Sequence, residues 1–180
     1  MDALLQHIAK VVSLTPAEQT TVCSYFTVKY LKKKESLFVE GDLVQTENFV
    51  IKGCLKTSSF NEKAEEHIIQ FSLENWWVGD LFSFLTRTPT RFRVVALEDT
   101  ELLQINRERL DALYDAVPAM ERYFRILVQN AYLASCRRVE QTIVLPAEER
   151  YHDFQQRYPD LEQRIPQYLI AAYLGMTPEF

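Results

Sequence analysis

Between about Thr27 and Gln104 the sequence alternates short runs of β-forming residues with turn signals, and this pattern constrains the fold more than any other feature. The runs are rich in Val, Ile, Phe, Tyr and Thr, and the turns include Glu40-Gly41-Asp42, Lys52-Gly53 and Val78-Gly79-Asp80. Strands are predicted over 28–32, 36–39, 47–52, 54–60, 66–72, 81–84, 92–97 and 101–105. Many short strands at this spacing favour a sandwich or a barrel-like roll.

Helices are predicted on both sides of the strand region. Two short helices, over 2–10 and 15–26, precede it, and Thr15 followed by Glu18 predicts a capping box for the second. A helix over 106–116 follows the strands. The dipeptide Leu145-Pro146 predicts a hinge, and another helix follows it over 147–158.

The longest helical pattern runs over 118–144 and carries a short heptad seam. Its apolar positions are spaced 4, 3, 4 and 3 residues apart, as in a coiled coil, and they are Met120, Phe124, Leu127, Ala131 and Ala134. These five residues are predicted to form a homodimer interface. The alternative is an ordinary amphipathic helix that packs on its own strand domain.

The final stretch, Gln167 to Phe180, has the spacing of a helix-turn-helix. Ala171 would allow a close approach of two helices, and Gly175 would adopt the left-handed conformation of the turn. Thr177, Pro178 and Glu179 suit the cap and first turn of a second helix, of which the sequence contains only the beginning. The alternative is a C-terminal helix with a glycine cap.

Composition narrows the possible classes of protein. The apolar fraction of 47% supports a real core, and no stretch approaches a membrane span or a secretion signal. Three scattered cysteines without metal-ligand spacing fit a reducing cytoplasm. The net charge of -5 predicts that this chain alone binds DNA weakly, since the positive charge of a recognition helix is missing from it.

The order of these elements resembles the Crp/Fnr family of bacterial transcription regulators over essentially the whole chain. The resemblance rests on an ordered set of short motifs rather than on any one of them. These motifs are Phe38-Val-Glu-Gly-Asp42, Phe49-Val-Ile-Lys-Gly53, Trp76-Trp-Val-Gly-Asp-Leu81, Ala96-Leu-Glu-Asp-Thr-Glu-Leu-Leu103 and Gln167–Glu179.

The resemblance implies an α+β fold in three parts. Residues 1–117 would form a cyclic-nucleotide-binding-like double-stranded β-helix, or β-roll, with flanking helices. Residues 118–144 would form the long dimerisation helix, and residues 145–180 the N-terminal part of a truncated winged helix-turn-helix. The resemblance also implies a cytoplasmic homodimer whose DNA contacts would include Gln167, Thr177, Pro178 and Glu179.

The effector pocket implied by the resemblance would involve Gly79, Asp80, Leu81, Arg91 and Arg93. Cyclic-nucleotide binders of this family carry a Gly-Glu-Leu turn and an Arg-Ser-Ala run. Here the turn has the shorter Asp80, and bulky Phe92 replaces the small residues beside the arginine, so a phosphate would lose its cradle. A cyclic nucleotide is therefore not expected, and an unknown small-molecule effector is possible.

Other chemistries find no support in the sequence. Cys23 stands alone where an iron–sulfur sensor would need a cluster, and His67 has no partner for a metal-dependent enzyme. No metal, cofactor or catalytic residue is predicted. The sequence therefore favours a DNA-binding regulator, and the alternative is a ligand-binding or protein-interaction module without DNA binding.

Overall fold

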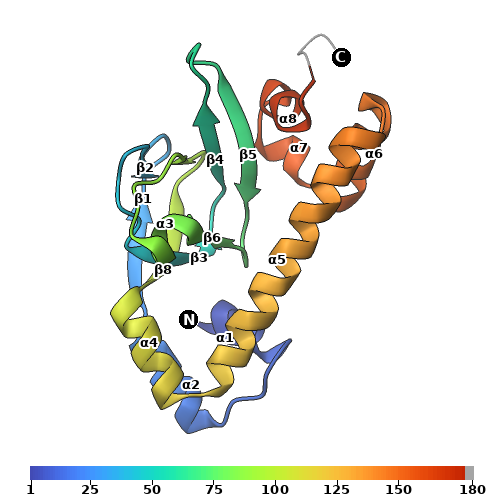
Figure 1. Cartoon of the computed structure of the whole chain (residues 1–180). Helices are drawn as coiled ribbons and strands as arrows, with labels where there is room; N and C mark the ends of the chain where they lie inside the picture. The colour runs from blue at the N-terminus through green and yellow to red at the C-terminus, as the bar shows by residue number, and fades with distance from the viewer. Residues whose placement is uncertain (177–180) are drawn as a thin grey trace.

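The computed structural model describes residues 1–176, and its strands form two four-stranded antiparallel sheets that face each other as a β-roll (Figure 1). One sheet has the order β1–β8–β3–β6 and the other the order β2–β7–β4–β5. The strands are β1 (Thr27–Leu31), β2 (Ser36–Phe38), β3 (Thr46–Lys52), β4 (Leu55–Phe60), β5 (Glu66–Ser72), β6 (Trp77–Val78), β7 (Arg93–Ala96) and β8 (Thr100–Asn106). The predicted fold class is confirmed.

The main core fills the space between the sheets and extends to the helices at one end of the roll. Phe49, Leu55, Val94 and Leu102 are fully buried in it. Strands β3 and β8 are covered on both faces, since their adjacent residues Val50 and Leu103 are buried as well. Asn48 is also fully buried, and its side-chain amide donates to the carbonyl oxygen of Val78 at 2.9 Å. That bond helps to hold the two-residue strand β6 against β3.

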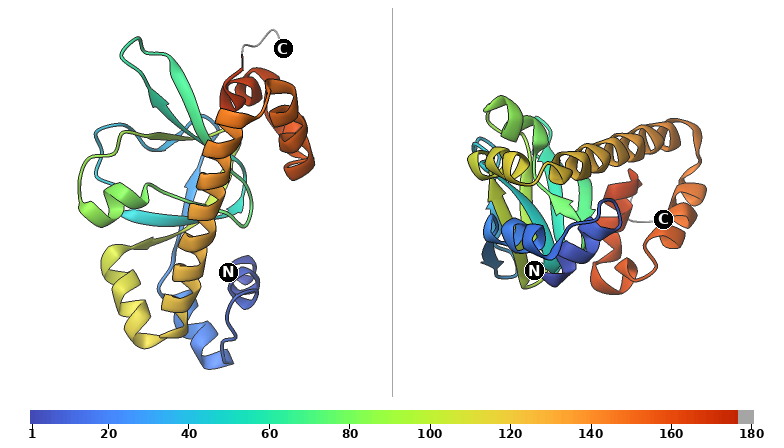
Figure 2. Two further views of the ribbon diagram at one scale, coloured as in Figure 1. Left: turned by 45° about the vertical axis from the view of Figure 1, so that its right-hand side comes forward. Right: turned by 90° about the horizontal axis from the view of Figure 1, so that it is seen from below.

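Helices flank the roll at both ends of the chain (Figure 2). They are α1 (Asp2–Ala9), α2 (Pro16–Ser24), α3 (Leu81–Thr86), α4 (Arg107–Ala116), α5 (Ala119–Val144), α6 (Ala147–Arg157), α7 (Leu161–Arg164) and α8 (Gln167–Leu174). The predicted capping box of Thr15 and Glu18 is present, and α5 ends one residue before Leu145. Within residues 1–176 no helix is both long and apolar enough to cross a membrane.

One predicted strand is wrong. Residues 81–84 lie in α3, not in a strand, because Asp80 caps that helix. The Asp80 carboxylate accepts hydrogen bonds from the backbone N–H groups of Phe82, at 3.1 Å, and Ser83, at 3.2 Å. An apolar run of this length does not distinguish a buried strand from a short helix, and here the cap decides between them.

Tyr123 fixes the start of the long helix. Its side chain is fully buried, and its hydroxyl accepts a hydrogen bond from the indole N–H of Trp77 at 2.9 Å. The same hydroxyl lies 2.7 Å from Nδ1 of His7. Burial, and secondarily Lys10, lower the pKa of His7, so the neutral ring can accept the hydroxyl proton. Helix α1, strand β6 and helix α5 therefore meet at one oxygen.

A second, smaller core joins the C-terminal helices to the outside of the roll. Strand β5 contributes Ile68 and Phe71, and the loop before β4 contributes Cys54. The helical side consists of Phe154, Leu161, Ile165, Leu169 and Ile170. Arg164 reinforces the contact, since its guanidinium pairs with Glu74 at 2.8 Å and Glu98 at 2.5 Å. In Figure 1, α7 and α8 lie beside the β4–β5 hairpin, with α6 following the end of α5.

Replacing Tyr123 with Phe should destabilise the protein, because the change keeps the ring and removes the shared hydroxyl. The Trp77 N–H and the His7 nitrogen would lose their partner, which costs about 1–3 kcal/mol of unfolding free energy. Urea unfolding followed by circular dichroism would measure the loss. Tyr30→Phe, at an exposed position of β1, is the matched control and should change stability by less than about 0.5 kcal/mol.

Candidate functional site

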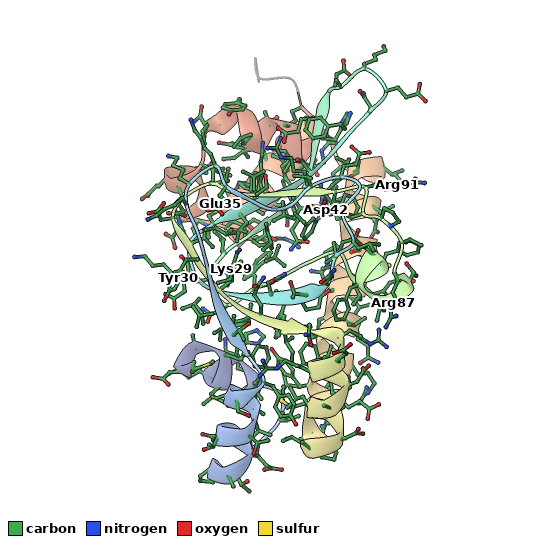
Figure 3. The ribbon with its side chains drawn as sticks, turned by 90° about the vertical axis from the view of Figure 1, so that its left-hand side faces the viewer. Lys29, Tyr30, Glu35, Asp42, Arg87 and Arg91 are labelled. Atoms are coloured by element: carbon green, nitrogen blue, oxygen red, sulfur yellow. The ribbon has the colours of Figure 1, made fainter. Side chains whose placement is uncertain are left out.

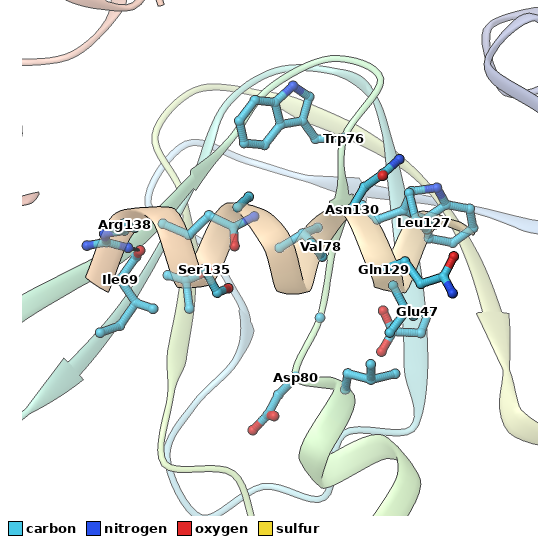
Figure 4. A pocket seen from close by; sticks show the side chains of 18 of the residues that line it. Glu47, Ile69, Trp76, Val78, Asp80, Leu127, Gln129, Asn130, Ser135 and Arg138 are labelled. Carbon is cyan, nitrogen blue, oxygen red and sulfur yellow. Dashed lines mark hydrogen bonds between the residues drawn. The ribbon is translucent and has the colours of Figure 1, made fainter. Parts of the chain in front are cut away.

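A cavity of about 1310 Å³ runs along α5, between that helix and the roll (Figure 4). Its walls are mostly apolar and include Trp76, Trp77 and Val78 of the roll and Leu127 of α5. The cavity also reaches α3 and α4 at one end and Tyr173 of α8 at the other. A single space is therefore bounded by the roll, the long helix and the C-terminal helices.

The end of the cavity near α3 is acidic. Glu47 comes from β3, and its carboxyl lies over Gly79, where a Cβ would be 2.6 Å from Oε2 and 2.8 Å from Oε1. Oε1 of Glu47 is shielded from solvent and has no hydrogen-bond partner among residues 1–176. Burial, and secondarily the charge of Asp80, raise the pKa of Glu47 to about 8. Gly79 is thus required for space and not for an unusual backbone angle.

The three predicted pocket residues of the turn, Gly79, Asp80 and Leu81, do line this cavity. Asp80, however, is engaged in holding the fold. Besides capping α3, its Oδ2 accepts a 2.6 Å hydrogen bond from the Thr90 hydroxyl. Both carboxylate oxygens are therefore satisfied, and Asp80 has little freedom to bind a ligand hydroxyl as the sequence comparison suggested.

Arg91 and Arg93, the two predicted pocket residues of the second motif, lie away from this cavity. Both side chains are exposed, and neither lines the cavity, whereas Phe92 between them does. Figure 3 shows Arg91 at the surface, and Arg93 makes long contacts, at 3.4 Å, with the Ser36 hydroxyl. Successive residues of an extended chain point to opposite faces, so turning Phe92 inward turns both arginines outward.

The backbone near Phe92 is also unsuited to a phosphate. The N–H of Thr90 donates to the Asp42 carbonyl oxygen at 2.8 Å, and the N–H of Phe92 donates to the Thr90 hydroxyl at 3.0 Å. A phosphate cradle needs such N–H groups free and a cation nearby. The residues of this cavity therefore do not fit a cyclic phosphate in the arrangement that the sequence comparison implied.

Of the predicted dimer residues, Met120 and Phe124 are buried in the main core of their own chain, whereas Ala131 and Ala134 are exposed. Leu127 packs partly against the same core, and Ala131 and Ala134 line the cavity. Heptad spacing reports which side of a helix is buried, and it does not report whether the partner is another chain.

A different side of α5 carries an exposed apolar stripe. Its members recur at intervals of four, seven and four residues and so share one face, and they are Val128, Tyr132, Val139 and Ile143. Val139 is 60% exposed and Ile143 is 77% exposed. Large apolar side chains gathered in this way on one face are typical of a surface that another molecule covers.

The C-terminal prediction is partly covered by the structure. Gln167 is the exposed first residue of α8, and Gly175 ends that helix in the left-handed conformation, with φ of 67°, as the sequence predicted. The N–H of Met176 donates to the Ala171 carbonyl oxygen at 2.9 Å, which closes the turn. Thr177, Pro178 and Glu179 lie outside the described residues.

Sequence reasoning missed Glu47 and Arg138. Arg138 lies at the other end of the cavity, donates to the carbonyl oxygens of Ile68, Ile69 and Tyr173, and lies 4.2 Å from the centre of the Tyr173 ring. It thereby ties α5 to β5 and α8. The one sequence feature that could have pointed to Glu47 is its spacing of two residues from Phe49, which places both side chains on the same face of β3.

Metal binding finds no support in the described part of the chain. No three His, Cys, Asp or Glu side chains of residues 1–176 gather in a geometry that could hold a metal ion. Cys54 is buried, its pKa is raised to about 12 by that burial, and it is a core residue on the outside of the roll.

Comparison with known proteins identifies the domain. Residues 28–116 match the family described as the cyclic nucleotide-binding domain. The transcriptional activator protein anr of Pseudomonas aeruginosa is 37% identical over 100 residues, which is 56% of this chain and 40% of that relative. The transcriptional activator protein FnrA of Stutzerimonas stutzeri is 36% identical over 92 residues, 51% of this chain and 37% of that relative. These matches span less than half of the length of each relative. By name both relatives are transcriptional activators, which agrees with the expectation that the chain is not an enzyme.

Solved structures show the same fold over most of the chain. The catabolite activator protein of Thermus thermophilus has a TM-score of 0.63 at 24% identity and covers 93% of this chain and 80% of its own. The c-di-GMP responsive regulator CLP of Xanthomonas campestris has a TM-score of 0.72 at 16% identity, with 92% and 87% covered. FixK2 of Bradyrhizobium japonicum has a TM-score of 0.71 at 17% identity, with 86% and 79% covered. At these identities the likeness is one of fold.

Glu47→Gln should stabilise the protein in a pH-dependent way. The folded-state pKa of Glu47, about 8, lies above the ordinary value of 4.5, so the folded wild type holds this proton more tightly than the unfolded chain. Its unfolding free energy therefore falls as the pH rises from about 4.5 to about 8, and glutamine removes this loss. The variant should match the wild type near pH 4.5 and exceed it by up to about 5 kcal/mol at pH 9.

Chemical unfolding at several pH values would test this expectation. Glu62→Gln, in the exposed β4–β5 turn, is the matched control and should follow the wild type throughout. An advantage of Glu47→Gln that stayed the same from pH 4.5 to 9 would contradict the assignment.

Proposed function

Because the chain belongs to the Crp/Fnr family, we propose that it works as a DNA-binding transcription regulator whose cavity beside α5 receives a small effector. One observation carries this proposal. The cavity is bounded at once by the roll, by α5 and by the C-terminal helices. A molecule bound there touches every part of the chain that would have to move. Such a position gives a ligand different contacts in two arrangements of the helices, which allosteric control requires.

The C-terminal helices are proposed to begin a helix-turn-helix. Helix α8 with its small Ala171 and its left-handed Gly175 has the features of the first helix and turn of such a motif. The proposed DNA contacts are Gln167, Thr177, Pro178 and Glu179. Glu179 would accept a hydrogen bond from a cytosine amino group, and Thr177 would meet a phosphate at the start of the second helix.

Dimerisation is proposed to use the exposed stripe of α5, namely Val128, Tyr132, Val139 and Ile143. These residues share one face of a 26-residue helix and leave the cavity side free for the roll. Two parallel copies of the helix packed through this stripe would place two C-terminal units side by side. In this proposal residues 1–117 form the sensor, 118–144 the dimer helix, and 145–180 the DNA-binding part.

The effector is proposed not to be cyclic AMP or another cyclic nucleotide. Three observations support this part of the proposal. Arg91 and Arg93 lie outside the cavity, the N–H groups of Thr90 and Phe92 are occupied, and the carboxyl of Glu47 lies on the cavity wall. A cyclic phosphate would thus meet an acid where it needs a cation.

Selection from random DNA duplexes, with the protein as its gene encodes it, would test the regulator proposal. We expect enrichment of a palindrome whose half-sites lie about one helical turn, 34–36 Å, apart, because a symmetric dimer presents two equivalent DNA-binding units. The selection should be repeated with a metabolite extract from the source cells, which supplies the effector. No enrichment in either condition, from a folded dimer, would favour a ligand-binding or interaction module that does not bind DNA.

Val139→Glu should convert the dimer to a monomer. The new carboxylate would lie in the middle of the apolar stripe, where a paired helix would bury it without a partner. Light scattering at several concentrations would show the mass falling by half. Val28→Glu is the matched control, because it adds the same charge at an exposed valine of β1, away from α5, and should leave the mass unchanged.

A further inference from the structure

Glu47 is the least satisfied polar group of the roll. Its carboxyl lies against the turn at Gly79, its Oε1 is shielded from solvent, and no hydrogen bond or ion pair to it exists within residues 1–176. A buried carboxyl without a partner costs stability, and proteins rarely keep one unless it has a task. The cavity beside it is the place where such a task would be performed.

Glu66, Glu74 and Glu98, three other partly buried glutamates of the roll, are paired, whereas Glu101 of β8 has no side-chain partner within residues 1–176. Glu66 accepts from Lys56 at 2.6 Å and from Ser58 at 2.7 Å. Glu74 accepts from the Gly53 N–H at 2.9 Å and pairs with Arg164. Glu47 differs from these glutamates because its Oε1 is both shielded from solvent and without a hydrogen-bond partner within residues 1–176.

The surroundings of Glu47 keep it available to a guest molecule. Gly79 leaves room for its carboxyl, since any side chain at that position would displace it. Asp80 is adjacent but fully engaged by Phe82, Ser83 and Thr90, so it contributes negative potential and no free hydrogen-bonding atom. Arg125 also lines the cavity, and its exposed guanidinium donates instead to Gln129 at 3.3 Å.

The remaining walls near Glu47 are apolar or aromatic. Trp77, Tyr114 and Phe124 stack edge to face in one cluster, and Leu81 and Phe84 of α3 complete the lining. Figure 4 shows Glu47 facing the space between α5 and Asp80, with Leu127 and Gln129 on the helix side. Aromatic faces attract cations, and apolar surface attracts a hydrophobic body.

We propose that Glu47 is the receptor for a ligand that carries a positively charged N–H group, such as an amine, amidine or guanidine, on a flat apolar body. On binding, Glu47 would release its proton to solvent, and the charged group would form a charge-assisted hydrogen bond with the resulting carboxylate. The body would lie among the aromatic side chains and against Leu127. This inference deepens the effector proposal above and rests on it. The proposed ligand is a cation, whereas a cyclic phosphate is an anion.

Matched probes would test the charge preference directly. Benzamidine, benzamide and benzoate share one ring and differ in charge, and the corresponding naphthalene compounds extend the apolar body. Each would be titrated into the protein while the two indole N–H signals, from Trp76 and Trp77, are followed by nuclear magnetic resonance. Both indoles line the cavity, so their shifts report binding at this site.

We expect the amidines to bind at least about tenfold more tightly than the amides and the carboxylates. Glu47→Gln should remove that preference, and Glu62→Gln should retain it. Gly79→Ala offers a second route, because its methyl group would push the carboxyl aside, and it should also weaken amidine binding.

Three results would overturn the proposal. They are a preference for benzoate or for cyclic AMP at the same indoles, an amidine preference that survives Glu47→Gln, and no indole shift from any amidine up to its solubility limit. The DNA selection above is independent of this titration. If a palindrome is recovered but amidines are not preferred, the regulator proposal stands and the assignment of Glu47 as the ligand receptor fails. If amidines are preferred but no palindrome is recovered, the assignment of Glu47 stands and the regulator proposal fails.

Discussion

The hydroxyl of Tyr123 is the point on which the rest of the structure depends. It joins the N-terminal helix, the short strand β6 and the beginning of α5, so it sets the angle at which the long helix leaves the roll. The next firm attachment of α5 is Arg138, fifteen residues on, which holds β5 and α8 by their carbonyl oxygens. Between these two attachments the helix stands away from the sheet, and the cavity exists because of that separation.

The two ends of the cavity solve the problem of buried charge in opposite ways. Arg138 donates hydrogen bonds to three carbonyl oxygens and packs over a tyrosine ring, so it connects α5 to β5 and α8. Glu47 has no such partners and remains an acid in an apolar wall. A fold shared with nucleotide-binding relatives can thus present different chemistry, because the fold fixes the shape of the space and a few side chains fix its charge.

The sequence was sufficient for the roll, the capping box at Thr15, the end of the long helix before Pro146 and the left-handed turn at Gly175, since each depends on neighbours within a few residues. Sequence reasoning could not predict features that depend on contacts between distant parts of the chain. The heptad spacing of Met120 and Phe124 marked a buried face without identifying what buries it, and Arg91 and Arg93 point outward because strand parity turns Phe92 inward. The isolation of Glu47 depends on β6, α4 and α5 at once, and no local pattern carries that information.

The small core that holds α6, α7 and α8 against β4 and β5 has a thermodynamic consequence. Separating the two surfaces would expose Ile68, Phe71, Leu169 and Ile170 to water, and exposure of apolar surface carries a positive heat-capacity change. Apolar attraction weakens on cooling, whereas the ion pairs of Arg164 do not share that dependence. The apolar part of this attachment would therefore weaken on cooling, whereas the ion pairs of Arg164 would remain.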